Sequence, residues 1–139
     1  MKFNTLFIPL SFALIFVGLS ACKKVEGPGG SSSIIGTIHV QELDGANNIM
    51  KEYDAPKYDV FLIYGGDTEN TYFDDDIETS FDGSFKFNYL EKGKYQLFVY
   101  EDSIISNGGS GKYATIYPVE ITEKKQENDL SVITVIKKF

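Results

Sequence analysis

The chain has 139 residues, with 13 basic and 20 acidic side chains and a formal net charge of −7 at pH 7. A length of this order corresponds to a single domain of ordinary size. All the basic residues are lysines, and an acidic chain without arginine is a poor match for nucleic-acid phosphates. Nucleic acid is therefore excluded as a partner.

The first 21 residues have the pattern of a cleaved signal peptide. Lys2 supplies a positive charge, and Leu6–Leu19 is an almost wholly apolar run interrupted by Pro9. A run of about 14 residues is shorter than the roughly 20 that a membrane-spanning helix needs. We expect residues 1–21 to be removed. Because this segment carries one lysine and no acid, the mature chain has a net charge of −8.

Cys22, the only cysteine in the chain, directly follows Leu19, Ser20 and Ala21. This tetrapeptide resembles the bacterial lipobox. The resemblance implies that Cys22 becomes the acylated first residue of the mature protein and anchors it in the cell envelope, at the outer membrane. Two or three acyl chains hold a protein at a membrane durably. The alternatives are an unpaired cysteine near the cleavage site of a secreted protein and a free buried thiol. The side of the membrane that the domain faces stays open.

Residues 22–33 are rich in glycine, proline and serine, and this composition predicts a flexible linker. From residue 34 to residue 139, short alternating or apolar runs follow one another with turn signals between them. Ile34–Leu43, Lys57–Tyr64 and Leu130–Lys138 are the clearest of these runs. This pattern predicts an all-β domain, a seven-stranded antiparallel β-sandwich. Pro118 disfavours a central position for its strand.

The stretch Phe81–Tyr100 is predicted to be a β-hairpin. Asp82-Gly83 is a turn signal, and two alternating runs are joined by a link that contains Gly93. Because side chains repeat every two residues, one face of each run is expected to lie in the core. The expected core residues are Phe85, Phe87, Leu90, Tyr95, Leu97 and Val99.

Three motifs resemble the carboxypeptidase regulatory-like family, which belongs with the transthyretin-like and collagen-adhesin B-type sandwich modules. They are Gly36-Thr37-Ile38, the segment from Asp82 to Phe87, and the segment from Gly93 to Leu97. The resemblance implies a Greek-key sandwich that is generally non-catalytic and serves as a stalk, spacer or docking module. The transthyretin-like hydrolases need several histidines and an arginine, whereas this chain has one histidine and no arginine. We therefore do not expect an enzyme.

Asp74, Asp75, Asp76 and Glu78, with Asp67 and Glu69 nearby, form the densest set of acidic side chains. Calcium takes six to eight oxygen ligands, so these residues are a candidate Ca²⁺ site. The alternative is a solvated acidic turn that blocks edge-to-edge strand pairing. No other cofactor is expected.

Aromatic residues offer a second candidate site. Phe98 and Tyr100 point away from the face of Tyr95, Leu97 and Val99. The hypothesis is that they form a partly exposed contact patch together with Tyr64, Tyr113 and Tyr117. The alternative is that loops or sheet edges cover these rings.

The sequence thus predicts a lipid-anchored, non-catalytic module of the bacterial envelope that acts as a structural or protein-docking element. Its expected partners are the membrane, through acylated Cys22, and another envelope protein. The alternative is a small lipoprotein that binds a glycan or Ca²⁺ through residues 67–78 and the neighbouring loops.

Overall fold

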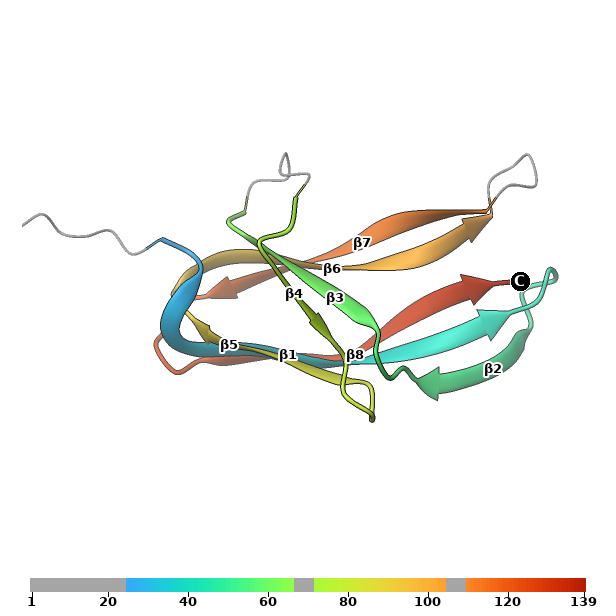
Figure 1. Cartoon of the computed structure of the whole chain (residues 1–139), viewed down its shortest axis with the longest axis horizontal. Coiled ribbons are helices and arrows are strands. Elements are labelled where there is room, and N and C mark those ends of the chain that lie inside the picture. The colour runs from blue at the N-terminus through green and yellow to red at the C-terminus, as the bar shows by residue number, and fades with distance from the viewer. Residues whose placement is uncertain (1–24, 67–71, 105–109) are drawn as a thin grey trace, which may run out of the picture.

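Two four-stranded sheets pack face to face in the computed structural model, which describes residues 25–66, 72–104 and 110–139 (Figure 1). In chain order the strands are β1 (Pro28–Leu43), β2 (Ile49–Asp54), β3 (Asp59–Tyr64), β4 (Asp75–Glu78), β5 (Ser84–Leu90), β6 (Gly93–Ile104), β7 (Ser110–Ile121) and β8 (Glu127–Lys138). The described part of the chain contains no helix long and apolar enough to cross a membrane. The predicted signal peptide, Cys22, Asp67 and Glu69 lie outside the described residues.

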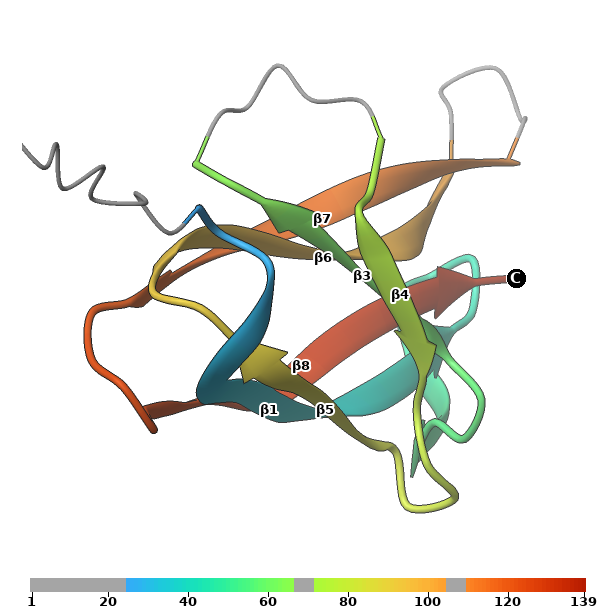
Figure 2. The same cartoon turned by 60° about the vertical axis from the view of Figure 1, so that its left-hand side comes forward.

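The first sheet is built around β1. One edge of β1 pairs with β8 in parallel; the other pairs antiparallel with β5 along its first half and with β2 along its second half. The second sheet is antiparallel throughout, in the order β4-β3-β6-β7. Figure 2 shows the two layers from another side.

The all-β sandwich is confirmed, but the expectation of seven strands in a wholly antiparallel arrangement is wrong. There are eight strands, and β1 and β8 run parallel. The sequence pattern does not predict β2, because the side chains of Ile49–Asp54 are almost all exposed and show no alternation of burial. Pro118 lies on β7, an edge strand of the second sheet, as predicted.

The core between the sheets is filled by apolar side chains from both inner faces. All six core residues predicted within Phe81–Tyr100 are buried, with exposures of 4% or less. The other members of the same buried cluster come mainly from β1, β3 and β8, and include Ile34, Ile38, Val40, Val60, Leu62, Ile133 and Val135. Burial of these side chains is the main favourable contribution to folding.

The predicted hairpin within Phe81–Tyr100 is wrong. Strand β5 pairs with β1 in the first sheet, whereas β6 pairs with β3 and β7 in the second. The link between β5 and β6 therefore carries the chain from one sheet to the other. Tyr89 and Gly93 have positive φ values of 60° and 149° on either side of this link. The Tyr95 hydroxyl donates a 2.7 Å hydrogen bond to the carbonyl of Glu91 and fixes the corner.

Gly83 forms the turn before β5 and marks the point where β1 changes partners. Its φ is +77°, and a Cβ atom at this position would lie 2.9 Å from the carbonyl oxygen of Ile38. The N–H of Ile38 donates to the carbonyl of Gly83, and the carbonyl of Ile38 accepts from the N–H of Ala55. A side chain at residue 83 would therefore disturb the junction of β1, β2 and β5.

Strand β1 begins at Pro28, so residues 28–33 of the predicted linker belong to the fold. Gly30 crosses directly over the end of β5, where a Cβ atom would lie 1.9 Å from the carbonyl oxygen of Leu90. The Ser32 hydroxyl donates to the carbonyl of Glu123 at 3.0 Å and accepts from the N–H of Gln126 at 3.1 Å. The small residues of this segment thus allow close packing and hold the β7–β8 turn.

Candidate functional site

Four aromatic side chains gather on the outer face of the second sheet. Phe61 on β3 and Phe98 on β6 are directly opposite each other, and their rings stack at 4.9 Å with an interplanar angle of 15°. Tyr100 meets the Phe61 ring edge-on at 5.5 Å, and Phe73, just before β4, lies 4.8 Å from it. We call Phe61, Phe73, Phe98 and Tyr100 the aromatic face.

The aromatic face combines a buried centre with an exposed rim. Phe98 is only 6% exposed, whereas Phe73 is 47% and Tyr100 is 42% exposed. Ile116 on β7, opposite Phe98 in register, extends the apolar surface and is 48% exposed. Contiguous apolar surface of this kind on the outside of a domain commonly marks a contact site.

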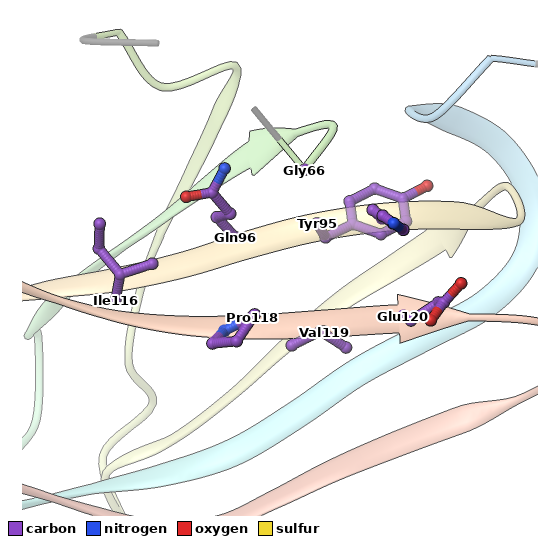
Figure 3. A pocket seen from close by; sticks show the side chains of 8 residues that line it. Gly66, Tyr95, Gln96, Ile116, Pro118, Val119 and Glu120 are labelled. Carbon is purple, nitrogen blue, oxygen red and sulfur yellow. The ribbon is translucent and has the colours of Figure 1, made fainter. Parts of the chain in front are cut away.

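A pocket of about 580 Å³ adjoins the aromatic face on the outer side of β6 and β7 (Figure 3). It includes Ile116 and Pro118, with Gln96 across from Pro118 and with Lys94 and Glu120 at one end. Phe98 follows Gln96 by two residues on the same side of β6, so the pocket and the aromatic face form one surface. An apolar floor with amide and charged groups at its margin suits a partner side chain or a small polar-rimmed ligand.

Both edges of the second sheet are poorly suited to adding a further strand. Strand β4 has four residues, three of which are acidic. Strand β7 carries Pro118, which has no N–H to donate. Short, charged or proline-containing edges hinder edge-to-edge pairing. The face of this sheet, rather than its edges, is therefore the surface open to a partner.

The five aromatic residues of the predicted patch do not form one surface. Phe98 and Tyr100 lie together on the outer face, with their rings 5.6 Å apart. Tyr64 turns inward and meets the buried Tyr95 ring at 5.9 Å. Tyr113 and Tyr117 follow the inward alternation of β7, and the Tyr113 hydroxyl donates to the Glu101 carboxylate at 3.2 Å.

Three residues of the surface are absent from the sequence prediction: Phe61, Phe73 and Ile116. Phe61 lies in the run from Tyr58 to Tyr64, which is almost continuously apolar and suited to a central strand. Strand β3 is indeed flanked by β4 and β6, but its outer side carries the aromatic face. In a two-sheet sandwich each strand has one side that faces away from the core. Apolar residues on both sides of the Tyr58–Tyr64 run could therefore have indicated an apolar outer surface that includes Phe61.

The acidic candidate site is spread over two sides of β4. Asp75 is opposite Leu62 and Asp76 is opposite Phe61, so their side chains alternate. The Asp74 carboxylate accepts a 2.7 Å hydrogen bond from the N–H of Tyr64. Among the described residues, no group of three or more histidine, cysteine or acidic side chains is arranged to hold a metal ion.

The hydroxyl of Tyr64 lies near this acidic segment. Burial is the largest cause that raises its pKa, and the negative charges of Asp75 and Asp74 add to the effect. The acids at the β4 edge therefore interact with Tyr64 in two ways. The charges of Asp75 and Asp74 raise the pKa of its hydroxyl, and the Asp74 carboxylate accepts a hydrogen bond from its backbone N–H. Asp76 and Glu78 are exposed.

Glu101 is a buried carboxylate that joins the two sheets at the end opposite Gly27. It is 6% exposed and accepts hydrogen bonds from the hydroxyls of Tyr113 and Thr115 on β7. It also accepts from the N–H of Ile136 on β8, at 3.2 Å. Nearby, burial and then the charges of Asp102 and Glu101 raise the pKa of Tyr58 to about 12. Buried acids are stable only when paired in this way, so we assign Glu101 a structural role.

No family model and no curated protein sequence matches the chain. Among solved structures, it is similar to a candidate carbohydrate-binding protein of Pseudomonas aeruginosa, with 12% identity, coverage of 81% of this chain and 92% of the other, and a TM-score of 0.47. It is also similar to the major pilin subunit of Bacillus cereus, with 16% identity and a TM-score of 0.45, over 78% of this chain and 30% of the pilin. The chain is thus a small two-sheet β-sandwich module with distant similarity to these proteins.

Proposed function

We propose that the chain is a non-catalytic, lipid-anchored module of the bacterial cell envelope that docks a partner protein on its aromatic face. The observation that carries the proposal is the exposed rim of Phe73, Tyr100 and Ile116 around the buried Phe98. Interfaces between proteins commonly have this plan, with an aromatic centre in a desolvated pocket and a surrounding rim. The anchor is acylated Cys22, proposed from the sequence, and the membrane is the outer membrane.

Charge narrows the class of partner. The aromatic face is bordered by Asp76 and Glu78 on β4 and by Glu120 on β7, with Lys94 opposite Glu120. The mature chain is also strongly acidic as a whole. A partner with an apolar patch rimmed by lysine or arginine would be complementary in both respects. We place the module with the carboxypeptidase regulatory-like sandwiches as part of this proposal, on the motifs at Gly36-Thr37-Ile38 and Gly93–Leu97.

Site-specific photo-crosslinking in the envelope tests the docking face. A photo-reactive residue is placed at Ile116 on the aromatic side, and in a matched strain at Val132, an exposed aliphatic position of the other sheet. We expect a discrete adduct from position 116 and none of the same mass from position 132. Equal adducts from both positions, or none from position 116, would contradict the proposal. An adduct of twice the chain mass would identify the partner as a second copy.

Substitution then measures the contribution of the rings. The double variant Phe73→Ser/Tyr100→Ser should weaken binding of the cross-linked partner by about thirtyfold or more, as expected for loss of an interface hot spot. Phe81→Ser is the matched control, because Phe81 is 95% exposed but lies on the turn before β5. Comparable loss in both variants would show that the contact does not depend on the aromatic face.

The pocket beside the aromatic face supports a second candidate, the binding of a small glycan. Gln96 and Glu120 border an apolar floor that includes Pro118, and such a floor can pack against a sugar ring. A ligand that binds only the folded state raises the melting temperature. A glycan-dependent rise that is lost in Gln96→Ala, without any adduct at position 116, would favour this candidate over protein docking.

A further inference from the structure

The proposed anchor residue, Cys22, precedes the folded part of the chain by only a few residues. Gly27 is held in the fold, since its N–H donates to the Tyr95 hydroxyl at 3.0 Å and its carbonyl accepts from the N–H of Glu91 at 2.9 Å. Five residue steps separate Cys22 from Gly27, which is a reach of about 18 Å when fully extended. With lipid on Cys22, Gly27 would stay within this distance of the anchor, but the tether alone would not orient the domain on the membrane.

Three segments distant in sequence meet at the Gly27 end of the sandwich. They are the start of β1, the β5–β6 link and the β7–β8 turn, which lie together at the end opposite the C-terminus (Figure 1). The N–H of Lys125 donates to the Ser31 hydroxyl at 3.1 Å and ties the turn to β1. Gly29, Lys92 and Lys124 line one shallow hollow across the three segments.

The charge of this end differs from that of the rest of the chain. Among the described residues, the ranges 25–27, 91–94 and 120–126 together contain four lysines and four glutamates, so this end carries no net charge. The mature chain has a net charge of −8, so the remaining residues are strongly acidic. Lys92, Lys124 and Lys125 are exposed. Basic groups next to a lipid anchor are attracted to an anionic membrane surface, whereas the acidic remainder is repelled from it.

Tyr89, just before the β5–β6 link, is the second observation at this end. It is 73% exposed although its neighbour Leu90 is buried. Its φ of +60° is unusual for a bulky side chain. The alternation of buried and exposed side chains along β5 is broken here, because Asn88 and Tyr89 are both exposed. Tyrosine is enriched at membrane interfaces because its ring is apolar and its hydroxyl is polar. Val25, which is 71% exposed, adds an apolar group at the same end.

We propose that this end of the sandwich docks on anionic phospholipid headgroups, with Lys92, Lys124 and Lys125 against the phosphates and Tyr89 at headgroup level. The inference rests on the proposed lipid anchor at Cys22. It goes beyond anchoring, because it fixes the orientation of the domain. The aromatic face then faces sideways along the membrane and is free for a partner protein.

The test uses the lipidated full chain in vesicles. Lipidation consumes the only cysteine, so an introduced cysteine is a unique labelling site. A fluorophore is attached at Glu123→Cys on the docked end or at Ala46→Cys in the turn at the far end of β1. Lipids spin-labelled at the headgroup serve as quenchers. We expect strong quenching at position 123 in phosphatidylglycerol-containing vesicles, weak quenching in phosphatidylcholine vesicles, and none at position 46 in either.

Charge variants test the role of the lysines. Each lysine near an anionic surface changes the docking equilibrium by about fivefold. The triple variant Lys92→Gln/Lys124→Gln/Lys125→Gln should therefore lower the docked-to-undocked ratio by about a hundredfold. The matched control Lys51→Gln/Lys57→Gln/Lys112→Gln removes equal charge elsewhere and should leave the quenching unchanged. Tyr89→Ser should lower the ratio further in the triple variant.

Flotation with the vesicles reports whether the protein is anchored in the membrane, independently of whether the domain docks on the headgroups. A protein that floats, yet is quenched equally in both lipids or equally in both triple variants, overturns headgroup docking and leaves the anchor in place. A protein that does not float overturns the anchor and the docking together.

Discussion

The outer faces of the two sheets have opposite chemistry. The outer face of the first sheet is polar and carries cross-strand pairs: His39 with Asp54 at 2.8 Å, and Lys86 with Glu127 at 2.8 Å. The outer face of the second sheet carries stacked aromatic rings. Both sheets cover the same core, so folding alone would be served by two polar outer faces. This difference between the two outer faces is the reason for proposing the aromatic face as the contact surface.

The centre of the aromatic face should nevertheless contribute strongly to stability. Phe98→Ala should lower the free energy of unfolding by about 3 kcal/mol, because Phe98 is 6% exposed and stacks on Phe61. The measurement is denaturant unfolding. Thr134→Ala, at an exposed central position of the polar face, should cost less than about 0.5 kcal/mol. Equal losses of unfolding free energy in Phe98→Ala and Thr134→Ala would contradict the prediction that the aromatic face contributes more to stability than the polar face.

The rim of the aromatic face should affect surface properties more than stability. The variant Phe73→Ser/Tyr100→Ser should elute clearly earlier than the parent chain in hydrophobic interaction chromatography, because both rings are more than 40% exposed. His39→Ser/Thr134→Ser changes two positions on the opposite face and should elute with the parent. Unchanged retention of the first variant would show that the rings are covered in solution.

The smallest expected effect is a pH dependence on the polar face. The hydrogen bond to Asp54 is the largest cause that raises the pKa of His39 above 6.5; burial, the next largest cause, lowers the pKa, and Glu52 raises it further. Since the pKa is higher in the folded state, the protonated pair stabilises the fold below pH 6.5. This contribution is lost as the pH rises through the folded-state pKa.

Two measurements check this prediction. The chain has one histidine, so a single NMR titration reports the folded-state value directly. The stability difference between the parent chain and His39→Gln should be larger at pH 5.5 than at pH 8.5. A titration midpoint at or below 6.5 would contradict the ion pair.

The sequence predicts which side of each strand is buried, but not which strand it pairs with. Alternation along Tyr95, Leu97 and Val99 is a local property, and it correctly identifies the core face. Sheet membership depends on hydrogen bonds to residues far along the chain. Two consecutive strands with matching buried faces can form a hairpin or lie in opposite sheets, and in both cases their apolar sides meet the same core. This ambiguity explains the mistaken hairpin.

The glycines and serines between residues 28 and 33 differ from the predicted flexible linker for another reason. Their composition predicts flexibility because they bury little apolar area. Here Gly30 is required for close backbone approach, and Ser31 and Ser32 provide hydroxyl groups that hold a distant turn. Such contacts appear only when the distant partner is in place, and for the two serines this partner is 94 residues away. The same limit applies to Phe73, whose ring joins the candidate site through a loop rather than through strand alternation.

The parallel pairing of β1 and β8 has a mechanical consequence. β1 starts at the end that we propose faces the membrane and β8 finishes at the opposite end, and their register runs from Ser33 opposite Glu127 to Leu43 opposite Lys138. A pull between the lipid and the far end of β8 would load these hydrogen bonds lengthwise, so that many must break together rather than in succession. The parallel register therefore predicts high resistance to a force applied along these two strands.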